Sequence, residues 1–174
     1  LWGPGAREEI VARLRSVGIR TFISEPRVLR DVARTWQSLA LLSPDPARSR
    51  ETALAWLREL DALAARYREA APVPVFVQLA ARPLLTLTDR DPLAQSLQMC
   101  GARNVFGQAP GVAPLVGIES VLAREPALVL SLNPDDAREP WQSLGLVRVG
   151  GGLRHASVDP AAQRPGPRSL RFLM

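Results

Sequence analysis

The chain has 174 residues, of which 47% are hydrophobic, so it can bury a sizeable core as one domain or as two small ones. No apolar run approaches the roughly 20 residues that a membrane-spanning helix requires, and no segment has the pattern of a signal peptide. The net charge is +5, but all 22 basic residues are arginines interleaved with acidic residues, a pattern typical of a solvated surface rather than of a nucleic-acid interface.

The first 45 residues predict one strand between two helices. Residues 8–17 form an amphipathic pattern that ends at Gly18, residues 19–24 alternate as a strand does, and residues 28–42 form a second helical pattern. One strand cannot bury both faces of a sheet. We therefore expect this part to belong to a larger lobe whose beginning is missing from the chain.

A single long helix is predicted over residues 46–71. Asp45 is a good N-cap, and Pro46 occupies the first helical position, where its missing N–H costs nothing. Apolar residues recur at spacings of three and four between this start and Pro72, and charged residues occupy mainly the other faces. Such a helix would span about 39 Å, which is the width of a small domain. The pattern favours a strut between two lobes.

Strands and helices alternate after this helix. Strands are predicted over residues 73–79, 127–132, 146–149 and 154–158, and helices over 92–100, 118–124, 135–144 and from 166 onward. Such alternation is typical of a mainly parallel α/β sheet. The predicted fold is thus α/β, with two Rossmann-like lobes joined by one long helix. Residues 1–45 would be the last part of an incomplete first lobe, 46–71 the bridging helix and 72–174 the second lobe.

The sequence offers no support for an enzyme or for a resident cofactor. Neither Gly3-Pro-Gly5 nor Gly150-Gly-Gly152 completes the G-x-G-x-x-G pattern of a dinucleotide site, and there is no G-x-S-x-G nucleophile motif. The one histidine, His155, lies in a predicted strand without an obvious catalytic partner. One histidine and one cysteine also cannot form the usual closed zinc site, so no metal site is expected.

Several stretches resemble the periplasmic cobalamin-binding proteins that feed ABC importers, which belong to the helical-backbone metal-receptor, or class III substrate-binding, proteins. The order of strand, Arg-Pro-Leu-Leu-Thr loop at 82–86, helix and Cys-Gly-Ala-Arg-Asn-Val-Phe at 100–106 is similar to their second lobe. Residues 117–126 resemble a further family segment, and residues 164–168, Arg-Pro-Gly-Pro-Arg, resemble its closing element. The resemblance covers nearly the whole chain and includes the bridging helix.

The resemblance implies that a corrinoid binds in the cleft between the lobes, where open α/β sheets also place ligands on physical grounds. Ala113 stands where some members carry a ligand-stacking tryptophan, so haem and ferric siderophores remain alternative ligands. Leu84 and Leu85 could instead be core residues, Trp2 an end-of-chain residue, and Asp159 and Arg164 a salt bridge or helix cap. The matching residues are Trp2, Pro83, Leu84, Leu85, Ala113, Asp159 and Arg164.

The resemblance also implies a partner and a location. Glu119 matches the family glutamate that docks on arginines of the membrane permease, although an acid in the first turn of a helix is favoured by the helix dipole alone. The protein would be a periplasmic monomer that delivers cobalamin to an ABC transporter and binds no nucleic acid. The alternative of another class is a small enzyme lobe or an arginine-rich interaction module.

Cys100 is the only cysteine. It is either a buried thiol or half of a pair whose other half lies outside the chain. In the family that the chain resembles, the matching cysteine pairs with one in the terminal helix, which here would fall just beyond Met174. A paired cysteine would fit an oxidising periplasm.

Overall fold

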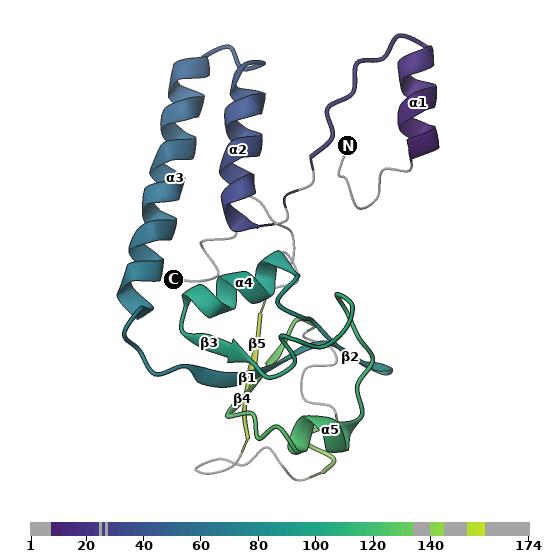
Figure 1. Ribbon diagram of the computed structural model, residues 1–174, viewed down its shortest axis with the longest axis vertical. Coiled ribbons are helices and arrows are strands. Elements are labelled where there is room, and N and C mark those ends of the chain that lie inside the picture. Colours follow the sequence, from purple (N-terminus) through teal and green to yellow (C-terminus); the bar gives the residue numbers. More distant parts are fainter. Residues whose placement is uncertain (1–7, 25, 27, 134–139, 145–152, 159–174) are drawn as a thin grey trace.

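The computed structural model describes residues 8–24, 26, 28–133, 140–144 and 153–158 (Figure 1). Helices and strands are mixed along the chain, as the sequence predicts for an α/β protein. The elements, in chain order, are α1 (Glu8–Ser16), α2 (Leu29–Ala40), α3 (Pro46–Tyr67), β1 (Val73–Ala81), β2 (Leu84–Thr86), α4 (Pro92–Met99), β3 (Ala102–Asn104), α5 (Ile118–Leu122), β4 (Leu128–Ser131) and β5 (Arg154–Ser157).

The five strands form one sheet that is mainly parallel. Strand β1 pairs with β4 in parallel along one edge, and β5 continues the sheet beyond β4. The other edge of β1 pairs with β3, in parallel, near its start and with β2, antiparallel, near its end. The sequence predicted β1, β4 and β5 but not β2 or β3, because three-residue strands leave too short a pattern to read.

Both faces of the sheet are covered, which explains the nearly continuous apolar run in β1. Successive side chains on a strand point to opposite faces. Val75 and Val77 pack in one core with Leu93 of α4. Phe76, between them in the chain, packs in a second core with Val121 of α5. Figure 1 accordingly shows α4 and α5 on opposite sides of the sheet.

A third core holds the helices α2, α3 and α4 together. Trp56, Leu60 and Leu63 of α3 are buried at spacings of four and three, and they pack against Leu29 and neighbouring residues of α2. Met99 and Cys100, at the end of α4, pack on the same core. Figure 1 shows α2 and α3 side by side, with α4 between this pair and the sheet.

The long helix is shorter than predicted. Helix α3 has 22 residues and ends at Tyr67, whereas the predicted helix continued to residue 71. Beyond Tyr67 the backbone N–H of Arg68 bonds to the carbonyl of Ala65, and that of Ala70 to the carbonyl of Tyr67, so the chain tightens into turns. Pro72 restricts only the residue before it, so the earlier end comes from this tightening of the last turns. The predicted start, with the Asp45 side chain accepting from the N–H of Arg48, is confirmed.

The predicted strand at residues 19–24 was wrong as a regular strand. Helix α1 ends at Ser16; Gly18, with a φ of 78°, then turns the chain, and the N–H of Ile19 bonds back to the carbonyl of Leu14. The segment that follows is extended, but no named strand includes it. A strand needs a neighbouring strand for its backbone hydrogen bonds, and the sheet of the described chain lies elsewhere.

Three predicted elements fall wholly or mainly outside the described residues. They are the helix at 135–144, the strand at 146–149 and the terminal helix from 166; the described piece of the first, residues 140–144, forms turns. No helix within the described ranges combines the length and apolarity that a membrane crossing requires.

Candidate functional site

The carboxyl ends of the parallel strands define one edge of the sheet. Gln78, Ser131 and Ser157 lie in register across β1, β4 and β5, so the three strands end close to one another. Open α/β sheets bind ligands at this edge because the loops that leave it can converge on one ligand. The edge is therefore the first place to search for a site.

Strand β1 runs past its neighbours and turns back at this edge. Its register with β2 shifts between Gln78 and Ala80, which marks a β-bulge, and the Arg82–Pro83 peptide bond at the turn is cis. Bulges re-aim the residues that follow them. Figure 1 shows β2 at the end of β1 that is farther from α3.

A second segment runs antiparallel beside β2. The N–H of Thr88 bonds to the carbonyl of Val112 at 2.9 Å, that of Thr86 to Pro114 at 3.2 Å, and that of Val116 to Leu84 at 3.1 Å. Leu85 and Leu115 form an antiparallel bridge in the same register. We call residues 83–88 and 112–116 together the edge ribbon.

Side-chain hydrogen bonds hold the edge ribbon in place. The Thr88 hydroxyl donates to the carbonyl of Gly111 at 2.9 Å. The amide of Asn104 donates to the carbonyl of Leu87 at 2.7 Å, and its Oδ1 accepts from the N–H of Phe106 at 3.0 Å. These hydrogen bonds join the edge ribbon to Asn104 of β3 and to Gly111, and so they hold its backbone in place.

The two faces of the edge ribbon differ. Leu84 and Val116 pack against the core on the α5 side of the sheet. Leu87 is buried on the α4 side. Because side chains alternate along each strand, Leu85 shares the α4 side with Leu87, and its bridge partner Leu115 lies beside it. Within the described residues, Leu115 is 67% exposed and Leu85 is half-buried on this face.

The structure therefore separates the predicted site residues. Leu84 is half-buried, as Leu85 is, but it packs against the core on the α5 side, so core packing competes with its predicted contact with ligand, which stays a prediction. Pro83 and Ala113 are exposed and Leu85 is half-buried, which leaves all three accessible at the edge. Trp2, Asp159 and Arg164 lie outside the described residues.

Sequence reasoning missed Leu115. Leu115 is 67% exposed, more than any other described leucine after β1 begins at Val73, although the edge ribbon fixes its backbone. The available signal was the alternation of Ala113, Pro114, Leu115 and Val116, but prolines and Gly111 make residues 110–116 look like a loop. The pairing with β2 holds this segment in an extended conformation, which places Leu115 beside Leu85.

Glu119 is exposed in the first turn of α5, as predicted. The nearby guanidinium of Arg124 is engaged elsewhere: it donates to the carbonyl and hydroxyl oxygens of Ser120 at 2.8 Å and lies over the ring of Phe106. Among the described residues, no ion pair involves Glu119. Its charge is therefore available at the surface.

The residues that could do chemistry lie away from the edge ribbon. Cys100 ends α4, and the next carbonyl, of Gly101, accepts from the N–H of Val73 at the opposite end of β1. Burial raises the pKa of the Cys100 thiol. His155 is half-buried within β5, opposite Val129 of β4. No group of three His, Cys, Asp or Glu side chains that could hold a metal ion occurs within the described part.

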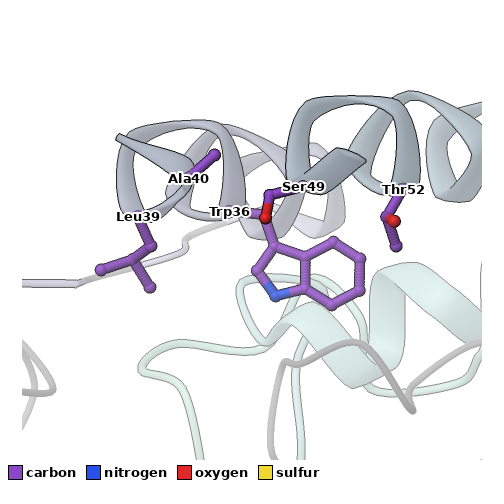
Figure 2. Close-up of a pocket in the computed structure, with 5 residues that line it drawn as sticks. All are labelled: Trp36, Leu39, Ala40, Ser49 and Thr52. Atoms are coloured by element: carbon purple, nitrogen blue, oxygen red, sulfur yellow. The ribbon is translucent and has the colours of Figure 1, made fainter. Parts of the chain in front are cut away.

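Two open grooves lie on the helical side of the molecule. One, of about 340 Å³, is lined by Trp36, Leu39, Ala40, Ser49 and Thr52, and Figure 2 shows the Trp36 indole beside it. The other, of about 500 Å³, lies where α2, α3 and α4 meet, and it is lined by Leu29, Leu60 and Met99 among others. Neither groove contains a residue that the sequence predicted to bind ligand.

No protein-family model matches the chain. The chain is 28% identical over 177 residues to the vitamin B12-binding protein of Vibrio parahaemolyticus, and the match covers 99% of the chain and 64% of that protein. Its fold is similar to the crystal structure of the periplasmic vitamin B12 binding protein BtuF of Vibrio cholerae, with a TM-score of 0.79 and 23% identity over 99% of the chain and 69% of that structure. The periplasmic heme-binding protein RhuT from Roseiflexus sp. RS-1 gives the same TM-score at 19% identity, covering 99% of the chain and 70% of that structure.

These likenesses bear on both fold and class. The chain spans 64% and 47% of the first two curated relatives, so it corresponds to part of their length. The similar structures confirm the expected α/β fold. All three of these similar proteins are named as binding proteins, which supports the expectation of a non-enzyme.

Proposed function

We propose that the chain, which is similar to vitamin B12-binding proteins in sequence and to a periplasmic vitamin B12 binding protein in fold, is part of a periplasmic protein of this kind. In this proposal the protein captures a cobalamin-type corrinoid between two lobes and delivers it to an ABC transporter permease. The observation that carries the proposal is the sequence likeness to a vitamin B12-binding protein over 99% of the chain. In this proposal residues 1–45 belong to the first lobe, α3 bridges the lobes, and residues 72–174 form the second.

The corrinoid would bind at the carboxyl edge of the sheet. Pro83, Leu85 and Ala113 of the edge ribbon would pack against it from the second lobe, because they are apolar and accessible at that edge. Trp2, Asp159 and Arg164 stay part of the proposed site by resemblance. Leu84 supports the surface from behind rather than touching the ligand.

Haem is the main alternative, because a heme-binding protein has a similar fold. Proteins hold haem iron through His, Tyr, Cys or Met side chains. This chain has one His, one Tyr, one Cys and two Met. Tyr67, Met99 and Cys100 pack against the helical core, and His155 lies within β5. Met174 lies outside the described residues.

The placement of these residues favours a corrinoid over haem. Cyanocobalamin carries both of its axial cobalt ligands, so an apolar wall can bind it without a coordinating side chain. A ferric siderophore likewise brings its own iron ligands, but none of the similar proteins reported above is named for one. The edge ribbon, with its exposed apolar residues, therefore fits cobalamin better than haem.

Binding can be tested by gel filtration of the full-length protein with cyanocobalamin. We expect the corrin absorbance to co-elute with the protein at one equivalent. Free cyanocobalamin that elutes entirely at its own volume would contradict the proposal, provided that the protein is folded by circular dichroism.

We propose that Glu119 docks the protein on its permease. Support comes from its exposure on α5 and from Arg124 being held by Ser120 and Phe106 instead. An exposed charge of this kind affects association and its salt dependence more than folding. The binding protein would act as a periplasmic monomer when it meets the two-fold transporter.

The docking proposal predicts separate effects on transport and binding. Glu119→Arg in the full-length protein should sharply lower vesicle transport while the affinity for cyanocobalamin and the melting temperature stay nearly unchanged. Glu59→Arg, an equal charge change at an exposed position of α3, is the matched control and should transport normally. If the Glu119→Arg variant transports normally, the docking proposal is wrong and Glu119 is only a charge at the start of a helix.

A further inference from the structure

We propose that Leu115, backed by Leu85, is the residue by which the second lobe contacts the flat apolar face of its ligand. The inference rests on the proposed corrinoid function and adds to it a residue that determines specificity. It is carried by the pairing of Leu115 with Leu85, by its exposure and by its place at the edge of the sheet.

The pairing fixes where Leu115 points. The three hydrogen bonds of the edge ribbon join residues 84 and 116, 86 and 114, and 88 and 112, so the register is constant along the ribbon. Residues 85 and 115 therefore face each other, with side chains on one side. This is the α4 side of the sheet, toward which α2 and α3 also lie in Figure 1.

Among the described residues, Leu115 is not packed into any of the three cores. Its neighbour Val116 packs into the core, whereas Leu115 keeps 67% of its surface in water. Burying an apolar side chain against a ligand is favourable in proportion to the apolar area removed from water. The edge ribbon already fixes the backbone of Leu115, so a ligand gains this burial without the cost of ordering that backbone.

The position of Leu115 lets it compensate for the small side chain of Ala113. Residues 113 and 115 lie two apart on the same extended segment, so their side chains emerge about 6–7 Å apart on one face. Ala113 is exposed but offers only a methyl group. Leu115 and Leu85 together supply the apolar area that Ala113 lacks, and both are within reach of a ring as wide as a corrin.

The test is a rescue experiment on the full-length protein, with cyanocobalamin affinity measured by titration calorimetry. Leu115→Ala should weaken binding about 5- to 30-fold, because it removes part of the apolar area buried on the ligand. The double variant Leu115→Ala with Ala113→Trp should recover most of the affinity. Leu122→Ala, which removes a leucine 39% exposed on α5, is the matched control and should bind as wild type.

Folding is followed in parallel, because Leu115 is exposed and its variants should keep the wild-type melting temperature. If Leu115→Ala binds as tightly as Leu122→Ala, or if Ala113→Trp restores nothing, the assignment of Leu115 is overturned and the corrinoid function stands. If the wild-type protein retains no cyanocobalamin, the proposed function fails and the inference fails with it.

Discussion

The two ends of the described chain solve the problem of burying apolar side chains differently. Fifteen large apolar side chains are exposed among the described residues; ten lie between Ile10 and Leu54, and five between Val73 and Leu144. The sheet region covers both of its faces with its own helices and loops, whereas α1 and the segment after it leave Ile19, Phe22 and Ile23 exposed.

The sheet region buries its core with its own residues, whereas the helical region does so only in part. A sheet with two covered faces closes its own core, so its stability is set by residues within it. A helix pair with one shared core, such as α2 and α3, needs a further layer to cover its remaining apolar side chains. The chain spans 64% and 47% of the length of the first two curated relatives.

The largest difference should appear between two tryptophans. Trp141 is fully buried, lies edge-on to Phe76 at 5.5 Å between ring centroids, and donates its indole N–H to Gln78. Trp36 is partly exposed beside the groove of Figure 2 and pairs with Trp56 at 6.3 Å. Trp141→Ala should cost about 3–5 kcal/mol of unfolding free energy. Trp36→Ala should cost only about 1–2 kcal/mol.

Urea unfolding of the 174-residue chain, followed by far-ultraviolet circular dichroism, measures both values. Equal losses for the two variants would break the comparison, because they would show that the helical region is as closely packed as the sheet region. A Trp36→Ala loss that grows in the full-length protein would sharpen it, by showing that the groove is covered there.

A smaller loss is expected at Gly107, inside the sheet region. A Cβ placed on Gly107 would lie 2.2 Å from Oδ2 and 2.5 Å from Cγ of Asp89. The short Asp89 side chain has little room to move, because its backbone N–H bonds to Gly107 and its carboxylate accepts from Gln108. Gly107→Ala should cost about 1–3 kcal/mol through overpacking.

The cause of the Gly107 effect can be checked by relieving the clash. Adding Asp89→Ala to Gly107→Ala should restore part of the lost stability, because the side chain that meets the new methyl group is gone. If the double variant in a urea titration is less stable than Gly107→Ala by the full cost of Asp89→Ala alone, the two residues do not interact and the account is wrong.

The smallest change in stability is expected at the two helix-capping aspartates, Asp91 of α4 and Asp45 of α3. Asp91 caps α4 by accepting from the N–H of Leu93 at 2.8 Å, and burial raises its pKa above the ordinary value of 3.8 although that hydrogen bond lowers it. Because the pKa of Asp91 is raised in the folded state, the contribution of this group to stability is fully present below 3.8 and is lost as the pH rises through the folded pKa. Asp91→Asn keeps the cap without a charge, so its stability relative to wild type should increase from pH 3 to pH 6.

Thermal unfolding across this pH range gives the measurement. Asp91→Ala removes the cap itself and should cost about 0.5–2 kcal/mol at every pH. Asp45→Asn, at the exposed cap of α3, should change stability by only about a few tenths of a kcal/mol at pH 6. A difference between Asp91→Asn and wild type that does not vary with pH would refute the burial argument.

Much of the fold could be predicted from the sequence where patterns are long and local. The start of α3, strand β1 and the helix at Pro92 follow from caps, proline placement and apolar spacing. The end of α3 and the segment at residues 19–24 could not, because the apolar spacing does not mark where the last turns tighten, and because a strand forms only where a neighbouring strand pairs with it. Short strands such as β2 exist only because their neighbours are in place.

The candidate site was predicted only in part. The resemblance pointed to Pro83, Leu85 and Ala113, which the structure leaves accessible at one edge. It did not show that Leu84 and Leu85 face opposite sides of the edge ribbon, because the side that each residue faces is decided by the register with β1 and by its bulge. It also did not single out Leu115, which lies beside Leu85 only through pairing across 30 residues of sequence.

The measurement that tests the central claim most directly is a competition between cyanocobalamin and haemin for the full-length protein, followed by equilibrium dialysis. The account predicts that about one equivalent of cyanocobalamin is retained and that an excess of haemin does not displace it, because the wall of Leu85 and Leu115 offers apolar contact and no iron ligand. Haemin that binds tightly and displaces cyanocobalamin would contradict the account, as would a folded protein that retains no cyanocobalamin.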